Sequence, residues 1–248
     1  MEENHFTIII DACNHEKWIE QCLNTALNQK YKNYEVILVD AKSTDKTFEI
    51  AKRYSEEYSS LKIFQNETRV PQIANMLWLT KLSKPNTICV SLDGDDYLNG
   101  GKVLNKLNNI YNSGDVWMTY GTYCEFPYRS VSHIYHAYPD SVIASNGFRE
   151  HQWLGSHLRT YRRELFLLID EKDFKFSDGR WLDTAGDLAF QFPMLEMSAE
   201  KSRYISEILY IYNVANQNSD GNTNAPRQRE VEAVVRAKVK YQRIEKIY

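Results

Sequence analysis

The sequence has no long apolar run and no strong excess of charge of either sign. No stretch approaches the roughly 20 apolar residues that a helix needs to span a bilayer. The start, MEENHFTIII, lacks the cationic and apolar segments of a signal peptide. A formal net charge of −3 argues against a general nucleic-acid-binding protein, which usually carries a basic surplus. We therefore expect a cytoplasmic protein with no transmembrane segment and no nucleic-acid partner, for which docking onto a membrane surface stays open.

Cysteine, proline and glycine are scarce. The four cysteines are Cys13, Cys22, Cys89 and Cys124. They form no CxxC pair and have no histidine at metal-ligand spacing, which favours free thiols in a reducing cytosol over disulfides or zinc. With 6 prolines and 10 glycines the chain has no Pro/Gly-rich linker, and it contains no repeat. A length of 248 residues with 43% hydrophobic content suits one domain with a sizeable core, in two halves of about 1–124 and 125–248.

Several common fingerprints of catalysis and ligand binding are also absent. The chain has no G-x-x-x-x-G-K-[ST] and no G-x-G-x-x-G, so it lacks the P-loop and dinucleotide fingerprints. No serine or cysteine lies in a recognisable nucleophile elbow. The acidic residues 93–96 lack the ligand spacing and the closing glutamate of an EF-hand loop.

Strand and helix patterns alternate along the first half. Apolar runs predict strands at 6–10, 34–39, 61–64, 87–90 and 115–120, and helical periodicity predicts helices at 18–27, 44–54, 71–82 and 104–111. This alternation implies right-handed crossovers and a Rossmann-like, mostly parallel sheet with helices on both faces. Ligands of such sheets bind beyond the carboxyl ends of the strands. We expect Asp11, Asp40 and Asp93 to meet there.

The second half is less regular. Residues 125–157 are rich in aromatics and predict a long shaped connection. Helices are predicted at 162–169, 185–197 and 229–244, and a strand at 205–212. The polar loop 213–225 after that strand is either a surface loop or a lid over the ligand.

Three carboxylates crowd together in SLDGDDY, residues 91–97. Burying them is costly unless a cation or a hydrogen-bond donor compensates. Aspartate oxygens suit Mg²⁺ or Mn²⁺, which also bind substrate phosphates. The motif therefore predicts a metal site, with a second carboxylate placed for a ribose hydroxyl. The structural alternative is an acidic turn, with Gly94 at the bend and aspartates capping the next helix.

The segment FTIIIDACNHEKWIEQCLNTALNQKYKNYEVILVDAKSTDKT resembles the opening of family 2 of the nucleotide-sugar glycosyltransferases. The family's "NQ-x-Y-x-N-x-E" and "VD-x-x-STD-x-T" segments both have counterparts here, and SLDGDD is similar to its metal-binding Asp-x-Asp. These motifs cover about the first hundred residues. The resemblance implies a GT-A fold, in which the first half binds the nucleotide sugar and the second half shapes the acceptor site.

The resemblance also implies roles in the donor site. The backbone at Ala12 and Cys13, with Asn14 and Asp40, would hold the base and ribose. Asp95 would coordinate Mn²⁺ or Mg²⁺ together with Asp93, which also reaches the ribose, whereas Asp96 would support the site or cap the next helix. Further candidates for nucleotide-sugar binding are Arg69, Asn75, Gly94, His157 and Arg159. Arginine suits phosphate oxygens because it binds them in a bidentate manner.

The chain departs from the family pattern at two positions. Asp11 stands where a proline is frequent, and Ala41 stands where a second aspartate is frequent. These departures bear on recognition of the base. UDP is the expected nucleotide, with GDP and dTDP as alternatives.

The acceptor half contains TAGDLAFQFPMLEM, which resembles the family segment where an acidic residue opens a helix beneath the donor sugar. Asp187 takes that position and would be the catalytic base, with Asp183 and Glu196 as competitors. The structural alternative for Asp187 is a helix-start carboxylate favoured by the helix dipole. Trp153 and Trp181 could each stack on a sugar or simply be buried.

The resemblance implies a metal-dependent, inverting glycosyltransferase of the hexosyltransferase type, acting in glycan biosynthesis. It would move a sugar from a nucleotide-diphosphate donor to a hydroxyl of a carbohydrate, lipid or protein acceptor. Two alternatives remain at this point. One is a nucleotidyltransferase, which would normally need a glycine-rich or basic loop that DACNHEKW does not supply. The other is a non-catalytic module that binds nucleotide sugars or glycans.

Overall fold

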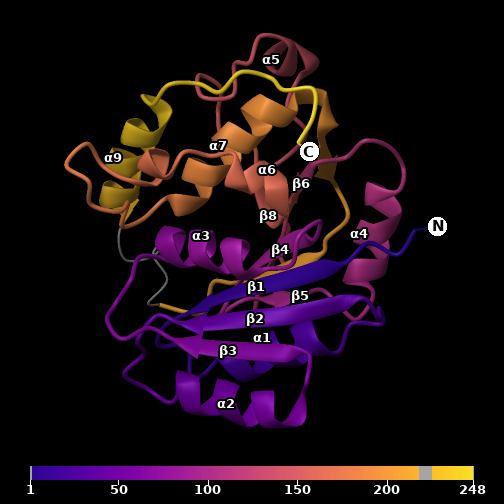
Figure 1. Ribbon diagram of the computed structural model, residues 1–248, viewed down its shortest axis with the longest axis vertical. Coiled ribbons are helices and arrows are strands. Elements are labelled where there is room, and N and C mark those ends of the chain that lie inside the picture. Colours follow the sequence, from indigo (N-terminus) through magenta and orange to yellow (C-terminus); the bar gives the residue numbers. More distant parts are fainter. Residues whose placement is uncertain (1, 218–224, 248) are drawn as a thin grey trace.

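A seven-stranded sheet runs through the centre of the molecule (Figure 1). The computed structural model describes residues 2–217 and 225–247. The strand order is β3-β2-β1-β4-β8-β6-β9, and β8 is antiparallel to both of its neighbours while the other pairs are parallel. The strands are β1 (Phe6–Ala12), β2 (Tyr34–Asp40), β3 (Leu61–Gln65), β4 (Ile88–Asp93), β6 (Met118–Gly121), β8 (Ser156–Arg162) and β9 (Ser202–Ile205).

A second, three-stranded sheet lies beside the first. Its order is β5-β10-β7, formed by β5 (Tyr97–Leu98), β10 (Tyr210–Asn213) and β7 (Cys124–Phe126). It therefore joins the chain just after the acidic motif to two segments of the second half.

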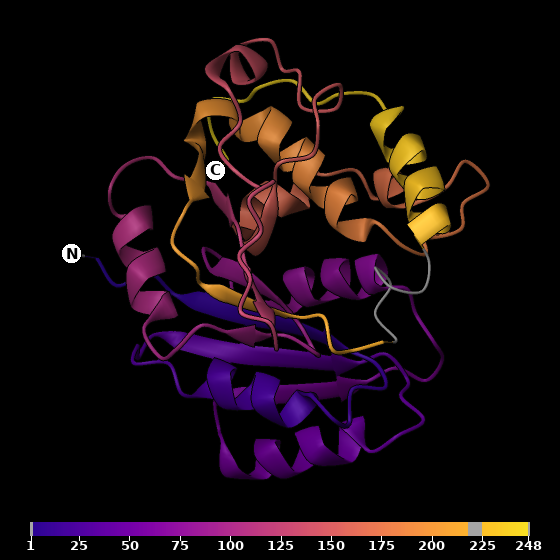
Figure 2. The ribbon, with the colours of Figure 1, turned by 180° about the vertical axis from the view of Figure 1, so that it is seen from behind.

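Helices cover both faces of the large sheet, as Figures 1 and 2 show from opposite sides. Side chains alternate along a strand, so Ile8 and Ile10 of β1 pack with α1, α2 and α4, whereas Ile9 packs with α3, α6 and α7. The helices are α1 (Ile19–Leu27), α2 (Thr47–Glu57), α3 (Gln72–Leu82), α4 (Val103–Tyr111), α5 (Asp140–Ala144), α6 (Arg163–Leu167), α7 (Gly186–Ser198) and α9 (Ala225–Arg236), with 3₁₀ turns at Glu171–Phe174 and Ala199–Lys201.

Helix α7 is buried between the sheet and the C-terminal segment. Asp187 is its one residue that is not buried. A helix whose residues are mostly apolar around its whole circumference belongs in a core, and Asp187 is the carboxylate of this one that reaches the surface of the site.

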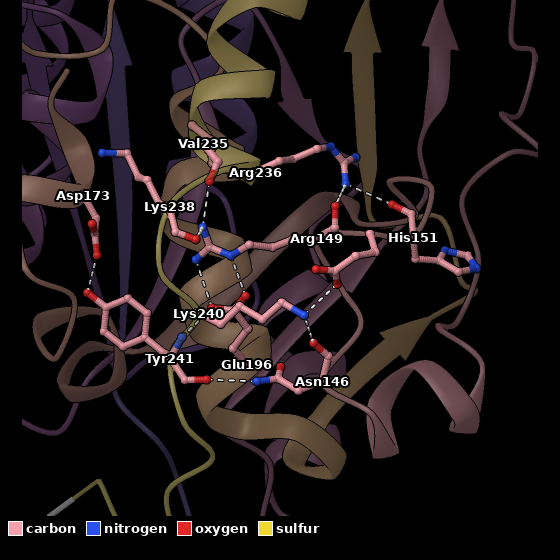
Figure 3. Close-up of polar contacts among 11 residues, drawn as sticks. Asn146, Arg149, His151, Asp173, Glu196, Val235, Arg236, Lys238, Lys240 and Tyr241 are labelled. Atoms are coloured by element: carbon pink, nitrogen blue, oxygen red, sulfur yellow. Dashed lines mark hydrogen bonds and ion pairs between the residues drawn. The ribbon is translucent and has the colours of Figure 1, made fainter. Parts of the chain in front are cut away.

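The C-terminal segment that follows α9 is fastened to α7 by a buried ion pair (Figure 3). Arg149 Nε donates to Glu196 Oε1 over 2.5 Å and Arg149 Nη2 donates to Glu196 Oε2 over 2.9 Å. Arg149 Nη1 also donates to the carbonyl oxygen of Val235, and the backbone N–H of Tyr241 donates to Glu196. These contacts explain why the helix predicted to 244 ends at Arg236.

Two other sequence predictions about the second half were wrong, and the last strand predicted in the first half is present but starts later. The strand predicted at 205–212 is two strands, β9 and β10, which belong to different sheets because the chain crosses between them. Strand β8 was not predicted, and it includes Arg162, where a helix was expected to begin. The strand predicted from 115 begins at Met118. The predicted loop 213–225 lies partly outside the described residues.

All four cysteines are free thiols. No helix in the described ranges has both the length and the apolar character that crossing a membrane requires.

Candidate active site

The carboxyl ends of β1, β2 and β4 bring three acidic residues to one edge of the sheet, as expected. Asp11 is paired in register with Asp93, and Ala12 with Asp40. A cavity of about 670 Å³ opens at this edge. Its lining includes Cys13, Arg69, Asp93 and Asp95 from the first half and His157, Arg159, Asp183 and Asp187 from the second half.

The acidic end of β4 is held by hydrogen bonds from both halves of the chain. Asp93 Oδ1 accepts from Gln72 Nε2 over 2.8 Å. Asp96 accepts from the Tyr210 hydroxyl over 2.6 Å and from the backbone N–H of Asn213 over 2.7 Å. Both oxygens of Asp96 thus have hydrogen-bond partners in the second half of the chain.

Asp95 lines the same cavity, and only one of its two carboxylate oxygens makes a short hydrogen bond within the described residues. Its Oδ2 accepts from Asn216 Nδ2 over 2.7 Å, whereas its Oδ1 lies 4.0 Å from His15 Nε2. Gly94 allows the close approach that places Asp95 here, since a Cβ at this position would lie 2.7 Å from the Cβ of Ala12.

The electrostatics of this cluster suit a cation. Burial raises the pKa of Asp93, Arg159 opposes that rise, and Asp95 adds to it. Burial, and then Asp95 and Asp93, raise the pKa of Asp96 well above its usual value. Ligand atoms of Asp93, Asp96 and His157 lie within 4.8 Å of one another. A divalent ion would favour the ionised carboxylates. Asp96 and His157 already have hydrogen-bond partners, which leaves Asp93 and the neighbouring Asp95, itself outside this set, as the hard oxygen ligands that fit Mn²⁺ or Mg²⁺.

The expected nucleotide pocket lies at the ends of β1 and β2. Asp40 is fully buried, and its Oδ2 accepts from the backbone N–H of Ser43 over 3.0 Å and from Gln65 Nε2 over 3.1 Å. Among the described residues its Oδ1 has no hydrogen-bond partner. Such an orphaned acceptor is costly unless a ligand or water donates to it. Asp40 is not itself part of the cavity lining, which at this point is formed by its neighbour Ala41 and by Cys13, so its contact with a nucleotide stays a prediction.

The loop after β1 is tied to the loop after β2. The carbonyl oxygen of Ala12 accepts from the backbone N–H of Ala41 over 2.8 Å. Asn14 has φ 57° and its Oδ1 accepts from the backbone N–H of Thr44 over 2.8 Å. The Asn14 side chain therefore joins the two loops, while Cys13 faces the cavity.

Asn75 lies beneath the edge of the sheet. Its Nδ2 donates to Asp11 Oδ1 over 2.6 Å, and its Oδ1 accepts from Asn66 Nδ2 over 2.8 Å. Burial raises the pKa of Asp11 to about 7, against the opposing hydrogen bond from Asn75. Arg69 is exposed and reaches the cavity from the loop before α3.

Strand β8 supplies the link between the acidic motif and α7. Arg159 Nη2 donates to Asp187 Oδ2 over 2.9 Å and lies 3.2 Å from His157 Nε2. Burial, and then Arg159, lower the pKa of His157 well below its usual value. A neutral His157 accepts from Arg159 at Nε2, which assigns the ring proton to Nδ1.

The three candidate bases differ in their surroundings. Asp187 stands at the start of α7, where Gly186 packs against Ile73 so closely that a Cβ would lie 3.0 Å from it. Asp183 is exposed and paired with Arg227 over 3.0 Å. Glu196 has no exposed side-chain surface and is paired with Arg149 (Figure 3).

Four aromatic side chains also line the cavity: Tyr123, Tyr135, Trp153 and Tyr212. Trp181 is absent from this lining and packs instead under Lys175 Nζ, 4.4 Å from the ring centroid. Sequence reasoning named Trp153 and missed the tyrosines. The aromatic content of residues 125–157 was a signal for Tyr135 alone, since Tyr123 precedes β7 and Tyr212 lies on β10, and it does not say which rings face a ligand.

Comparison with protein families adds an independent finding. The family model of glycosyl transferase family 2 matches residues 7–168. The chain is 41% identical over 70 residues to the dolichyl N-acetyl-alpha-D-glucosaminyl phosphate 3-beta-D-2,3-diacetamido-2,3-dideoxy-beta-D-glucuronosyltransferase of Methanococcus voltae, covering 27% of this chain and 22% of the relative. It is 33% identical over 118 residues to an uncharacterized glycosyltransferase of Haemophilus influenzae, covering 47% and 46%. The chain thus spans less than half the length of these relatives.

Solved structures share the fold. S. aureus TarS 1-349 in complex with UDP-GlcNAc superposes with a TM-score of 0.68 at 19% identity, over 93% of this chain and 65% of that one. The mannosyltransferase PcManGT of Pyrobaculum calidifontis, in complex with GDP-Man and Mn²⁺, gives a TM-score of 0.61 at 15% identity, over 89% and 60%. These likenesses confirm the expected mixed α/β GT-A fold.

Proposed function

Because the chain belongs to glycosyl transferase family 2, we propose that it transfers a sugar from a nucleotide-diphosphate donor to an acceptor hydroxyl. One observation carries the proposal. A single cavity is lined by both the acidic end of β4 and Asp187. Arg159 connects the two, because it donates a hydrogen bond to Asp187 and its charge opposes the rise in the pKa of Asp93.

The donor is proposed to be a UDP-sugar. The orphaned Oδ1 of Asp40 would accept a hydrogen bond from the base or ribose, beside the backbone of Ala12 and Cys13. UDP and UDP-GlcNAc complexes of the fold neighbour TarS support this choice, and the GDP-Man complex of PcManGT keeps GDP as the alternative. Arg69 and Arg159 are the cations of the cavity lining that suit the diphosphate.

A divalent cation is proposed to bind at Asp95 and Asp93, with Asp96 supporting both through its bonds to Tyr210 and Asn213. Bound there, Mn²⁺ or Mg²⁺ would neutralise negative charge on the departing diphosphate. The Mn²⁺ in the PcManGT structure supports this assignment.

Asp187 is proposed to be the general base. It takes the proton of the acceptor hydroxyl as that oxygen forms a bond to the anomeric carbon. The bond from the anomeric carbon to the diphosphate breaks on the opposite side, and the diphosphate leaves with the electron pair, so the configuration inverts. Arg159 holds the Asp187 carboxylate in place through the 2.9 Å hydrogen bond to Oδ2.

The test compares Asp187→Asn with the matched control Asp183→Asn. Asparagine keeps the size and hydrogen-bonding capacity of aspartate but cannot take the proton. We expect kcat to fall at least about a hundredfold in Asp187→Asn, as for loss of a general base, and to stay near wild type in Asp183→Asn. Single-turnover transfer and nucleotide titration are measured on the same preparations. A rate of transfer by Asp187→Asn within a few-fold of wild type would show that Asp187 is not the general base, which would then be Asp183 or no protein group.

The donor itself is identified first. Purified protein is incubated with Mn²⁺ and a panel of UDP-, GDP- and dTDP-sugars, and release of the nucleoside diphosphate is measured. Release of pyrophosphate from a nucleoside triphosphate and a sugar phosphate would instead indicate a nucleotidyltransferase. Binding of a donor without any turnover, even with acceptors added, would indicate a non-catalytic module.

A further inference from the structure

Three tyrosines, which we call the tyrosine cluster, form one wall of the cavity: Tyr123, Tyr135 and Tyr212. The ring centroid of Tyr123 lies 5.5 Å from that of Tyr135 and 5.0 Å from that of Tyr212. All three rings are partly exposed although each contacts another. The cluster is therefore a surface of the cavity and not part of the closed core.

The cluster is assembled from segments far apart in the sequence. Tyr123 precedes β7, Tyr135 lies in the long connection after β7, and Tyr212 lies on β10. The Tyr204 hydroxyl donates to the carbonyl oxygen of Tyr135 over 2.9 Å, which fastens the connection to β9. The rings are thus held in position before any ligand binds, and a preorganised surface binds at a lower entropic cost.

The cluster reaches Asp187 through two intervening side chains. The His157 ring lies 5.8 Å from the Tyr123 ring and 5.7 Å from the Tyr212 ring. His157 in turn contacts Arg159, which donates to Asp187. The tyrosines therefore lie close to the proposed base.

The cluster lies away from the expected nucleotide pocket. Asp40 is on β2, whereas His157 beside the cluster is on β8, and β1 and β4 lie between these strands. Three strand spacings of about 4.8 Å give a separation of roughly 14 Å. A nucleotide base can also stack on aromatic rings, but a base held at Asp40 leaves the tyrosines to another ligand.

The charges beside the cluster favour a neutral ligand. Asp183 and Asp187 also line the cavity, and each is already paired with an arginine, Arg227 and Arg159 respectively. An anionic acceptor would meet carboxylates, whereas an uncharged sugar can lay its C–H face on the rings and bond its hydroxyls to polar groups.

We propose that the tyrosine cluster is the acceptor subsite and that it binds an uncharged sugar ring. The inference rests on the proposed function, and it narrows the acceptor to a carbohydrate, either a free glycan or the sugar head of a glycolipid. Tyr135 is the residue that tests it best, because its described ring contact is with Tyr123 and it meets His157 only through that ring, although its hydroxyl lies near enough to Arg159 to act on that charge.

The experiment measures transfer to methyl glycosides, octyl glycosides and sugar phosphates, with the donor found in the panel above. We expect the glycosides to be acceptors and the sugar phosphates to be poor ones. A free glycan as the natural source predicts equal use of methyl and octyl glycosides, and a lipid-linked source predicts preference for octyl glycosides. Preference for the sugar phosphates would overturn the proposal.

Three variants locate the subsite. Tyr135→Ala should raise the acceptor KM about five- to a hundredfold, the usual effect of losing one stacked ring, while UDP affinity stays at the wild-type value. Tyr135→Phe keeps the ring and should recover most of that loss. Tyr128→Ala is the matched control, because Tyr128 lies in the same connection but is 76% exposed and outside the cavity lining.

The outcomes separate this inference from the proposed function. If the wild-type protein releases no nucleoside diphosphate from any donor, the proposed function fails. If transfer occurs but Tyr135→Ala and Tyr128→Ala have the same acceptor KM, the tyrosine cluster is not the acceptor subsite. Loss of UDP affinity in Tyr135→Ala would also count against it, since the ring would then serve the nucleotide.

Discussion

Replacing Arg149 by methionine should destabilise the protein more than any change at a surface ion pair. The side chains of Arg149 and Glu196 are 2% and 0% exposed. Arg149 connects the segment before β8 to α7 and to the end of α9 (Figure 3). Without it, the Glu196 carboxylate stays buried with the Tyr241 N–H as its one remaining donor in the described part of the chain.

The size of the effect follows from this burial. Removing one partner of a buried ion pair costs about 3–5 kcal/mol, because the other charge is left uncompensated. A chain of this length shifts its melting temperature by about 2–4 °C per kcal/mol. We therefore expect a drop of roughly 6–20 °C for Arg149→Met. The double variant Arg149→Met/Glu196→Met should recover much of this drop, since no isolated charge is left inside.

The assay is thermal unfolding followed by circular dichroism for both single variants, the double variant and a surface control. Lys106→Met is the control, because it breaks a 2.6 Å pair whose side chains are 37% and 57% exposed. Exposed pairs contribute about 0–1 kcal/mol. A melting temperature of Arg149→Met no lower than that of Lys106→Met would refute the reasoning. So would a double variant that is as unstable as both single changes added together.

Three further predictions concern the carboxylates at the edge of the sheet. Asp95→Ala should abolish transfer while keeping the fold, and EDTA should abolish transfer by the wild type in a way that added Mn²⁺ reverses. Near wild-type transfer by the variant would show that Asp95 is not a metal ligand. Asp40→Ala should raise the nucleotide Kd more than it lowers kcat, because its contacts persist in ground and transition states; an unchanged Kd by calorimetry would contradict this. For Asp11, a folded pKa of about 7 lies above the unfolded value near 3.8. The folded state then keeps a proton that the unfolded state loses, so this residue lowers stability as the pH rises from about 4 to 7. Asp11→Asn should remove up to about 4 kcal/mol of that loss. The free energy of unfolding, measured in EDTA from about pH 4 to 7, should therefore differ increasingly between the variant and the wild type. A constant difference across this range would show that Asp11 is ionised in both states.

The first half of the fold could be predicted because its signals are local. The run Phe6–Ile10 and the run Tyr34–Val39 are apolar on both faces, as buried parallel strands require. Each ends in an aspartate, and parallel strands place their ends at one edge. The sequence thus determined the four parallel strands β1 to β4 and the edge at which Asp11, Asp40 and Asp93 meet.

Strand β8 and its neighbours could not be predicted in this way. SHLRTYR has no apolar run, and its residues are buried because Arg159 and His157 find partners in the site. The segment from Ile205 to Tyr212 reads as one strand, yet its first residue ends β9 and its last three belong to β10, and these strands lie in different sheets. The pairing of these strands depends on packing between segments distant in the sequence, and such packing produces no periodic pattern in either segment.

The same distinction applies to the functional residues. The sequence by itself determined that Asp187 stands at the start of an apolar helix. Only the tertiary structure decided that Arg159 holds this carboxylate, that Glu196 is closed off by Arg149, and that three tyrosines share one wall with the acidic motif. A sequence pattern reports which face of one segment is apolar, because the directions of its side chains follow from the period of that segment alone. The contacts of a site depend on where the sheet and the crossing segments bring distant side chains together.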